Sequence, residues 1–458
     1  MTDTDNSADA ELPTVAVDTT LSDLYRQAGP AYSDKPPRSR LINRKYIYQD
    51  GPFTSNNGEP NSEKEVMATA IKYLSLITQR DTFICGAGPI ISDPSRFSVK
   101  TSIRFLIKEA EIDFLACKVV SDDLERCNNV VPLETHWYLN SKRALADSSL
   151  PTPKCIALTI DGFSVDAQSC CAICIRYGLD SFVIPADCTG ARGIWLQEQS
   201  QRIYKALKYH ALPLVLKNQA TFGGAGTFIV KTEEERQKIV DELGKGFLSR
   251  LLSSVNADNL HLEPATMLLS DLIQDPVGDY GITFFVNEKG RRPVFLGVSK
   301  QMIEDGTAWV GSIIDYRQQS ELREKFDTLL NRISDWLQSY GYIGPAGADI
   351  LEDTDGFHVV DLNIRTTGSL RLPLLQTHFT SRGLNVASSF SIDVQQRRDD
   401  FSNMYKSEFQ EGRVCIVSWY EDEETGSSLT ELVIGGEDDA KLKRLMDRVK
   451  ENSNSVTF

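Results

Sequence analysis

A hairpin near residue 355 is the feature that most constrains the fold of this 458-residue chain. Two apolar runs, 348–351 and 357–361, flank the turn sequence Thr354-Asp355-Gly356. Turn residues of this kind between apolar runs indicate two antiparallel strands. Because side chains two positions apart on a strand face the same side, Asp361 and Asn363 point together. The sequence therefore predicts a hairpin with polar side chains on one face of its second strand.

This polar face has the composition of a metal site. The turn brings Asp349 of the first strand alongside Asp361 and Asn363, and Arg365 continues the same face. Two carboxylates and one amide oxygen suit a hard divalent ion such as Mg²⁺ that also contacts phosphate. The alternative interpretation is that the two aspartates are strand-edge charges that face water.

A lysine followed by a glycine-rich loop is the second informative feature. Lys217 ends an apolar run, and residues 219–227, with Gly223, Gly224 and Gly226, join it to the next run. Glycine has no Cβ, so backbone N–H groups in such a loop can approach phosphate oxygens. The loop is not a P-loop, because GxxxxGK[ST] is absent and a strand follows it. The alternative is a flexible hairpin turn.

The charge balance and the cysteines narrow the class of protein. The chain has 49 Lys and Arg against 64 Asp and Glu, a formal net charge of −15, which disfavours nucleic-acid binding. No run approaches the roughly 20 apolar residues that span a bilayer. Residues 1–12 are polar and acidic, unlike a secretory signal or a transit peptide. Nine cysteines without a paired CxxC pattern indicate reduced thiols. We therefore expect a cytoplasmic protein that binds neither nucleic acid nor a membrane.

Hydrophobic periodicity predicts a mixed α/β architecture. Residues 1–40 have the composition of a disordered acidic tail, with four prolines after position 12 and little apolar periodicity. A capping box at Ser62 predicts a helix, and strand-like runs at 82–85 and 114–120 on either side of an amphipathic segment at 103–107 indicate a small βαβ unit. A second capping box, Thr232-x-x-Glu235, predicts another helix start. Further helices are predicted at 140–146, 170–177, 195–209, 321–340 and 438–450, and further strands at 155–158, 181–184, 214–217, 228–230, 267–269, 281–286, 294–298, 414–419 and 432–434.

Taken in order, these features resemble the ATP-grasp superfamily over residues 140–385. In that family an early lysine follows a Ser or Asp, a second lysine ends a strand before a glycine-rich loop, and an acid on one strand precedes acid-x-Asn-x-Arg on the next. The matching residues here are Lys142, Lys217, Asp349 and Asp361-Leu362-Asn363-Ile364-Arg365. Family members usually carry Glu at the two acidic positions, and their usual hinge Glu pair is absent from residues 269–273.

The resemblance implies roles for individual residues. Phosphates would be held by Lys142, Lys217, Gly223, Gly224, Ala225 and Gly226. Adenine would meet backbone groups of Asp271 and Leu272, and the ribose would meet Asp279. Lys300 would be a third phosphate cation or else an exposed strand-end lysine, and Arg371 would face the acceptor or the phosphate or else be a surface charge. Mg²⁺, with Mn²⁺ as the alternative metal, would bind Asp349, Asp361 and Asn363. Arg365 and Lys217 would be the catalytic residues.

The implied function is ATP-dependent ligation of a small-molecule carboxylate to an amine through an acyl phosphate, with release of ADP and phosphate. The substrates would be of amino-acid or small-peptide type. The alternatives are another ATP-grasp activity (a thioester-forming synthetase, a carboxylase or a kinase) and a catalytically inactive nucleotide-binding regulatory protein.

The implied fold class is α/β with α+β character, built on an ATP-grasp fold. The implied divisions are a tail at 1–40, a pre-ATP-grasp α/β domain at 41–135, a central and lid subdomain at 136–270, a C-terminal subdomain with the metal site at 271–400, and a small β-β-α extension at 401–458.

Overall fold

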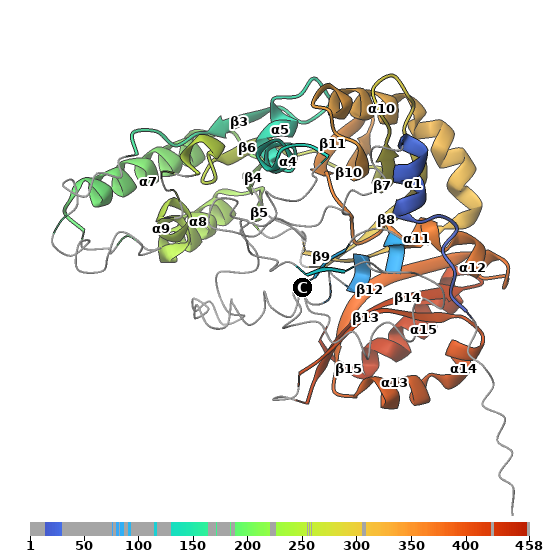
Figure 1. Cartoon of the computed structure of the whole chain (residues 1–458). Helices are drawn as coiled ribbons and strands as arrows, with labels where there is room; N and C mark the ends of the chain where they lie inside the picture. Colours follow the sequence, from blue (N-terminus) through green and yellow to red (C-terminus); the bar gives the residue numbers. More distant parts are fainter. Residues whose placement is uncertain are drawn as a thin grey trace, which may run out of the picture.

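The computed structural model describes most of the chain from residue 130 onward and separate pieces before it (Figure 1). The described residues are 14–29, 76, 79–81, 83–86, 90–92, 114–116, and 130–455 except for 164–170, 172–183, 185–187, 220–225, 254, 256, 258, 305–307 and 423–425. Apart from Leu76, Cys171 and Ile184, the helices predicted after Ser62 and at 170–177 and the strand predicted at 181–184 lie outside these residues.

A large antiparallel sheet forms the centre of the molecule. Among the described residues its strands run in the order β11-β10-β7-β8-β9-β12-β14-β13, with β15 paired to β12. The strands are β7 (Gly278–Val286), β8 (Val294–Glu304), β9 (Ala308–Asp315), β10 (Gly344–Asp353), β11 (Gly356–Asn363), β12 (Val386–Val394), β13 (Val414–Glu421), β14 (Ser428–Gly436) and β15 (Ser453–Ser455). The predicted hairpin at 354–356 joins β10 to β11.

One long helix and two short ones cover the β7–β10 region of this sheet. Helix α10 (Gln319–Ser339) buries Phe326, Leu330 and Ile333 against Ile282 and Phe284 of β7. Burial of side chains of this size stabilises the fold by about 1.5–3 kcal/mol each. Helices α4 (Leu133–Leu139) and α5 (Lys142–Ala146) add to the same core. The helix predicted at 321–340 is thus confirmed, and its apolar side chains cover one face of the central sheet.

A second, four-stranded sheet forms a separate lobe, seen at the left of Figure 1. Its strand order is β3-β6-β4-β5, all antiparallel, and it comprises β3 (Cys155–Leu158), β6 (Met267–Asp271), β4 (Leu214–Asn218) and β5 (Thr227–Val230). The helices of this lobe are α7 (Ala191–Tyr209), α8 (Glu233–Glu242) and α9 (Leu248–Ser253), with a π-helical turn at Leu243–Phe247. The predicted capping box starts α8, because Thr232 Oγ1 accepts from Glu235 N and the Glu235 carboxylate accepts from Thr232 N.

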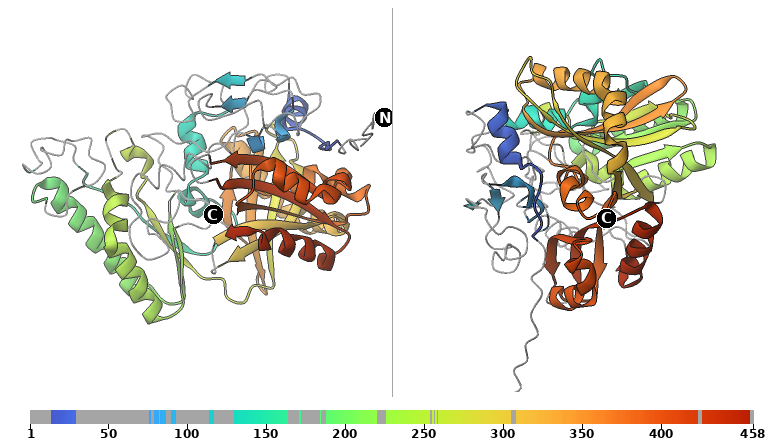
Figure 2. Two further views of the ribbon diagram at one scale, coloured as in Figure 1. Left: turned by 90° about the horizontal axis from the view of Figure 1, so that it is seen from below. Right: turned by 90° about the vertical axis from the view of Figure 1, so that its right-hand side faces the viewer.

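The C-terminal elements extend the central sheet. Strands β13 and β14 follow β12 in the sheet order, and α15 (Asp439–Glu451) packs Leu442, Met446 and Val449 against them. The remaining short helices are α11 (Arg371–Leu374), α12 (Gln376–Thr380), α13 (Arg398–Met404) and α14 (Lys406–Gln410), with 3-10 turns at Leu260–Leu262 and Tyr316–Gln318. The expected β-β-α arrangement is present, and Figure 2 shows its strands continuing beside the earlier ones.

The N-terminal region corrects two predictions. Residues 21–28 form helix α1 (Leu21–Ala28), whose capping box links Thr20 and Asp23 and whose Tyr25 ring meets Phe285 edge-on at 5.0 Å. Leu21, Leu24 and Tyr25 are buried, so the prediction of a disordered tail is wrong for this stretch. The run 83–85 is helical, not a strand.

A parallel strand pair lies elsewhere in the N-terminal region. Strand β1 (Ile90–Ser92) pairs in parallel with β2 (Phe114–Ala116), the latter within the strand predicted at 114–120. No described helix is long and apolar enough to cross a membrane. The mixture of helices and antiparallel sheets agrees with the predicted fold class, whereas the domain boundaries stay predictions.

Candidate active site

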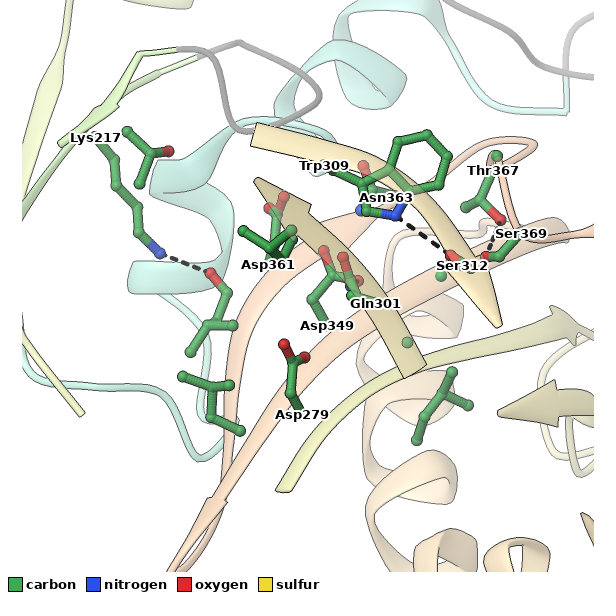
Figure 3. A pocket seen from close by; sticks show the side chains of 18 of the residues that line it. Lys217, Asp279, Gln301, Trp309, Ser312, Asp349, Asp361, Asn363, Thr367 and Ser369 are labelled. Atoms are coloured by element: carbon green, nitrogen blue, oxygen red, sulfur yellow. Dashed lines mark hydrogen bonds between the residues drawn. The ribbon is translucent and has the colours of Figure 1, made fainter. Parts of the chain in front are cut away.

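The hairpin register places the two predicted metal-binding aspartates side by side. Asp349 of β10 is directly opposite Asp361 of β11, and Gly347 is opposite Asn363. Directly paired residues of antiparallel strands share a face of the sheet. Figure 3 shows Asp349, Asp361 and Asn363 turned toward the same space. The predicted geometry of the hairpin is confirmed.

The same face continues across the neighbouring strands. Asp349 pairs with Gly281 of β7, Gly281 pairs with Ser299 of β8, and Gln301 of β8 pairs with Ser312 of β9. The side chains of these residues all point to one face of the sheet, because the residues are either directly paired across two strands or two positions apart on one strand. The carboxylates therefore lie at one end of a polar strip that runs across the sheet.

This strip lines a cavity of about 350 Å³ between the two sheets. The four-stranded lobe contributes Val215, Thr227 and Ile229, followed by residues 271–273. Figure 3 shows Lys217 on one side of the carboxylates and Trp309, Ser312 and Ser369 on the other. The cavity therefore has two ends, one bordered by the small lobe and one by β9 and the loop after β11.

Two lysines reach the carboxylate end from different elements. Lys142 Nζ donates to Asp361 Oδ1, and Lys217 Nζ donates to Val360 O at 2.8 Å. Both side chains line the cavity. Burial lowers the pKa of Lys217, and the charge of Asp361 counteracts that shift. A buried lysine held beside carboxylates has lost much of its hydration, so it can exchange to a phosphate oxygen at low cost.

The position of Lys142 depends on the residue that follows β4. Ser141 caps α5 by accepting from Ala144 N at 3.2 Å. The backbone N–H of Lys142 donates to Gln219 O at 2.9 Å, and that of Arg143 donates to Gln219 Oε1 at 3.1 Å. Gln219 thus fixes the first turn of α5 against the start of the glycine-rich loop, which couples the two lysines structurally.

The carboxylate pair is electrostatically strained. Burial raises the pKa of Asp349 to about 7, and the charge of Asp361 acts in the same direction. Gln301 Nε2 donates to Asp349 Oδ1 at 2.5 Å and Lys142 neutralises part of the charge. Two buried carboxylates on paired strands form a site that a divalent cation would stabilise.

The donor set fits a metal that shares its coordination with phosphate. Among the described residues no three His, Cys, Asp or Glu side chains gather closely enough to form a complete protein cage. Mg²⁺ is usually bound through one or two carboxylates together with substrate phosphates, so a cage is not required. Asp349 and Asp361 supply the carboxylates and Asn363 the amide oxygen.

Arg365 lies at the junction of the two ends of the cavity. Its Nη2 donates to Asn363 Oδ1 at 2.7 Å and its Nη1 donates to Thr366 O at 3.1 Å. The guanidinium group lines the cavity beside the predicted metal-binding amide. It is therefore placed to meet negative charge that develops next to Asp349, Asp361 and Asn363.

The structure places some of the predicted nucleotide-contacting residues in the cavity and others outside it. Asp271, Leu272 and Asp279 line the cavity, and burial raises the pKa of Asp279. Lys300 is exposed and lies on the opposite face of β8 from Ser299 and Gln301, so the structure does not bring it into the cavity.

The glycine-rich loop and Arg371 also differ from the predictions in part. Gly223, Gly224 and Ala225 lie outside the described residues, whereas Gly226 has a φ of +67° and accepts from Asn218 N at 2.9 Å. Arg371, for which a surface position was the alternative prediction, is fully buried and pairs with Glu431. The surface alternative for Arg371 is therefore wrong.

Several cavity residues were not predicted from the sequence. They are Arg80, Gln301, Trp309, Ser312, Thr367, Ser369, Ser391 and Glu431. The polar positions 299, 301, 312, 389 and 391 alternate within their strands, and this period-two pattern is the signal that could have found them. Without knowledge of the strand pairing, nothing links that pattern to the hairpin at 354–356.

Comparison with known proteins agrees with this geometry. The family model described as L-aspartate–L-methionine ligase, ATP grasp, matches residues 196–363, which include Lys217, both aspartates and Asn363. Residues 196–363 of the chain thus match an ATP-grasp family. Within the ATP-grasp superfamily, the matching model is one of amino-acid ligases. No protein of curated function shows a significant sequence match.

Solved structures resemble the chain at low sequence identity. N5-carboxyaminoimidazole synthetase from Staphylococcus aureus with ADP has a TM-score of 0.44 and 11% identity, covering 82% of this chain and 94% of its own. Biotin carboxylase from Campylobacter jejuni has a TM-score of 0.46 and 13% identity, covering 84% and 89%. Phosphoribosylamine–glycine ligase from Thermotoga maritima has a TM-score of 0.45 and 11% identity, covering 84% and 95%.

Proposed function

We propose that the protein is an ATP- and Mg²⁺-dependent ligase that activates a carboxylate as an acyl phosphate and joins it to an amine, with release of ADP and phosphate. The observation that carries this proposal is the meeting of Asp349, Asp361 and Asn363 with Lys142 and Lys217 in one cavity. Phosphoryl transfer requires mainly positioning and charge neutralisation, which this set of residues can provide.

The chemistry divides into two steps. An oxygen of the carboxylate substrate attacks the γ-phosphorus of ATP, and the bond from that phosphorus to the β–γ bridging oxygen breaks as ADP leaves. The amine nitrogen then attacks the acyl carbon, phosphate leaves, and the nitrogen loses a proton. Neither step needs a covalent enzyme intermediate, so no activated Ser or Cys is required.

The residues of the cavity take complementary roles in this proposal. Lys142, Lys217 and the backbone of residues 223–226 bind the phosphates, while backbone groups at Asp271 and Leu272 meet adenine and Asp279 meets the ribose. Asp349, Asp361 and Asn363 hold Mg²⁺ or Mn²⁺, which when bound neutralises charge on the phosphates. Arg365 stabilises the acyl phosphate and the later oxyanion.

The family model supports one class of substrate for this proposal. The matching model is named for a ligase of L-aspartate and L-methionine, so amino acids are the first substrates to test. We propose substrates of amino-acid or small-peptide type. The cytoplasmic location expected from the sequence is part of the same proposal.

The proposal is tested by ADP release with pairs of carboxylate and amine substrates. Aspartate with methionine is the first pair, followed by the remaining amino acids and by simple organic acids, with mass spectrometry of the product. We expect ADP, phosphate and an amide in equal amounts. A thioester, a carboxylated product or a phosphorylated product would instead indicate another ATP-grasp activity. No nucleotide turnover with any pair would leave a nucleotide-binding regulatory protein.

A further inference from the structure

The second end of the cavity carries charges that the phosphoryl-transfer residues do not use. This distal end is lined by Arg80, Trp309, Ser312, Ser369, Ser391 and Glu431. Arg80 belongs to the N-terminal part of the chain and Glu431 to β14 near the C-terminus. Both lie outside the segment matched by the family model.

The sheet register shows that Glu431 faces the same way as the metal-site carboxylates. Ser312 of β9 pairs with Ser389 of β12, and Ser391 of β12 pairs with Glu431 of β14. These pairings extend the polar strip that begins at Asp349. Five strand-to-strand steps separate β10 from β14 along the sheet, and residues of both strands line the same cavity. Glu431 therefore serves a part of the cavity other than the metal site.

The loop after β11 crosses this strip and joins the two ends. A Cβ added to Gly368 would lie 2.3 Å from the Trp309 ring, so the loop packs directly on β9. Arg371, at the end of the same loop, donates through Nη2 to Gly368 O at 2.7 Å and pairs with Glu431. Arg365 begins this loop. The loop therefore leads from the distal end to the residues proposed to act in phosphoryl transfer.

The distal charges are balanced in number. Arg371 is fully buried and bonds Ser389 Oγ at 3.2 Å in addition to its pairing with Glu431. Burial and the nearby charge of Arg80 lower the pKa of Arg371, and Asp81 opposes that shift. At the distal end Arg80 and Arg371 thus stand beside Asp81 and Glu431, and the charge of Arg365, at the junction with the other end, also acts on Asp81. A ligand that carries one positive and one negative group would leave this balance unchanged, whereas a simple anion or cation would bring an uncompensated charge into a buried site.

Hydrogen-bonding capacity is also left over at this end. Arg80 Nε, with Arg371 Nε and Nη1, is buried without an acceptor among the described residues. The Glu431 carboxylate has two oxygens, and its ion pair with Arg371 uses Oε1. A buried donor without a partner costs about 1–3 kcal/mol, so a ligand carboxylate that reached Arg80 would recover part of that energy.

We propose that the distal end binds the amine-bearing substrate as a free amino acid, with Arg80 contacting its carboxylate and Glu431 its amino group. This inference rests on the proposed function and deepens it by naming the substrate class and the residues that select it. The aromatic face of Trp309 and the hydroxyl groups of Ser312, Ser369 and Ser391 surround the side chain of the bound amino acid. The C-terminal elements thereby contribute to specificity.

The test compares free amino acids with their carboxamides as amine substrates in the ADP-release assay. The wild-type protein should prefer the free acid in kcat/KM by about tenfold or more, because the amide lacks the charge that Arg80 binds. Arg80→Gln should reduce that preference to within about threefold, and Arg80→Lys should restore part of it. The KM for ATP should stay unchanged in both variants.

A second variant examines Glu431 directly. Glu431→Gln should raise the KM for the amine substrate about tenfold or more, while the KM for ATP changes less than about twofold. The matched control is Glu437→Gln, because Glu437 of the same C-terminal region pairs with Arg413 at 2.7 Å and lies away from the cavity. If Glu431→Gln does not fold, the Arg80 series decides the matter alone.

The outcomes separate this inference from the proposed function. Equal use of amide and free acid by the wild type, or an unchanged preference in Arg80→Gln, would overturn it. ADP release with amines that lack a carboxylate but with no amino acid would also overturn it and leave the ligase proposal intact. Absence of ADP release with every pair would remove the ligase proposal and this inference with it.

Discussion

Replacing Asp361 by Asn removes one negative charge from the centre of the candidate site with little change in shape. The carboxylate lies opposite Asp349, pairs with Lys142 Nζ and accepts from Leu362 N at 2.9 Å. The amide of the variant keeps one oxygen acceptor for the backbone. We therefore expect the fold to survive and the effect to fall on turnover.

The magnitude follows from the charge that is lost. A unit charge about 4 Å from another contributes about 4 kcal/mol at an effective dielectric constant of roughly 20. If Asp361 holds a Mg²⁺ ion that neutralises the transferring phosphoryl group, losing its attraction for that ion lowers the rate by about three orders of magnitude, since each ~1.4 kcal/mol is tenfold. Nucleotide affinity should fall less, because Lys142 and Lys217 still meet the phosphates. The substitution also removes the repulsion between Asp361 and Asp349, and this gain should limit the loss in the free energy of unfolding.

The assay measures ADP release by Asp361→Asn at limiting and at saturating Mg²⁺, together with nucleotide binding and thermal unfolding. The control is Asp355→Asn, which makes the same chemical change at the exposed tip of the same hairpin. The control should keep wild-type turnover. Turnover of Asp361→Asn within about threefold of wild type at limiting Mg²⁺ would refute the metal assignment.

Four further predictions address other parts of the site and fold. Lys217→Ala should weaken ATP binding about 10- to 100-fold, as expected for a charge-assisted contact of about 1.5–3 kcal/mol, while exposed Lys205→Ala should not. Hydrogen exchange across residues 219–227 should slow on addition of ATP and Mg²⁺, because backbone amides there would bind phosphate; equal rates at saturation would contradict the loop assignment. Leu24→Ala should lower the free energy of unfolding by about 2–5 kcal/mol in urea melts, and exposed Gln27→Ala by far less, if α1 is docked as described. An ¹⁸O label in the substrate carboxylate should appear in the released phosphate, and stoichiometric AMP with pyrophosphate would disprove the acyl-phosphate route.

Local sequence signals predicted several elements of the fold, including the hairpin that carries the candidate site. The hairpin at 354–356 and the capping box at Thr232 depend on residues a few positions apart, and both are present as expected. The helix at 321–340 was equally clear, because its apolar stripe persists over several turns. The side-by-side placement of Asp349 and Asp361 followed from the hairpin alone.

The errors arose where tertiary packing outweighs composition. Helix α1 has only eight residues in a proline-rich, acidic stretch, and it is stable because Leu21, Leu24 and Tyr25 are buried against the distant strand β7 and its neighbours. The run 83–85 is apolar because it is buried, which suits a helix as well as a strand. For Lys300, the sequence could not decide between a phosphate contact and an exposed position, because it does not show which face of β8 the side chain occupies; the structure has it exposed.

The distal end of the cavity shows why specificity is harder to predict than chemistry. The phosphoryl-transfer residues gather on one hairpin and two neighbouring elements, so a short motif carries their signal. Arg80 and Glu431 are 351 positions apart and come together only because β14 pairs with β12 and thereby extends the sheet. A one-residue slip in that pairing would turn Glu431 to the opposite face and remove it from the cavity. In the function proposed above, the register of the C-terminal strands therefore determines substrate choice, although neither strand contains a residue assigned to the phosphoryl-transfer step.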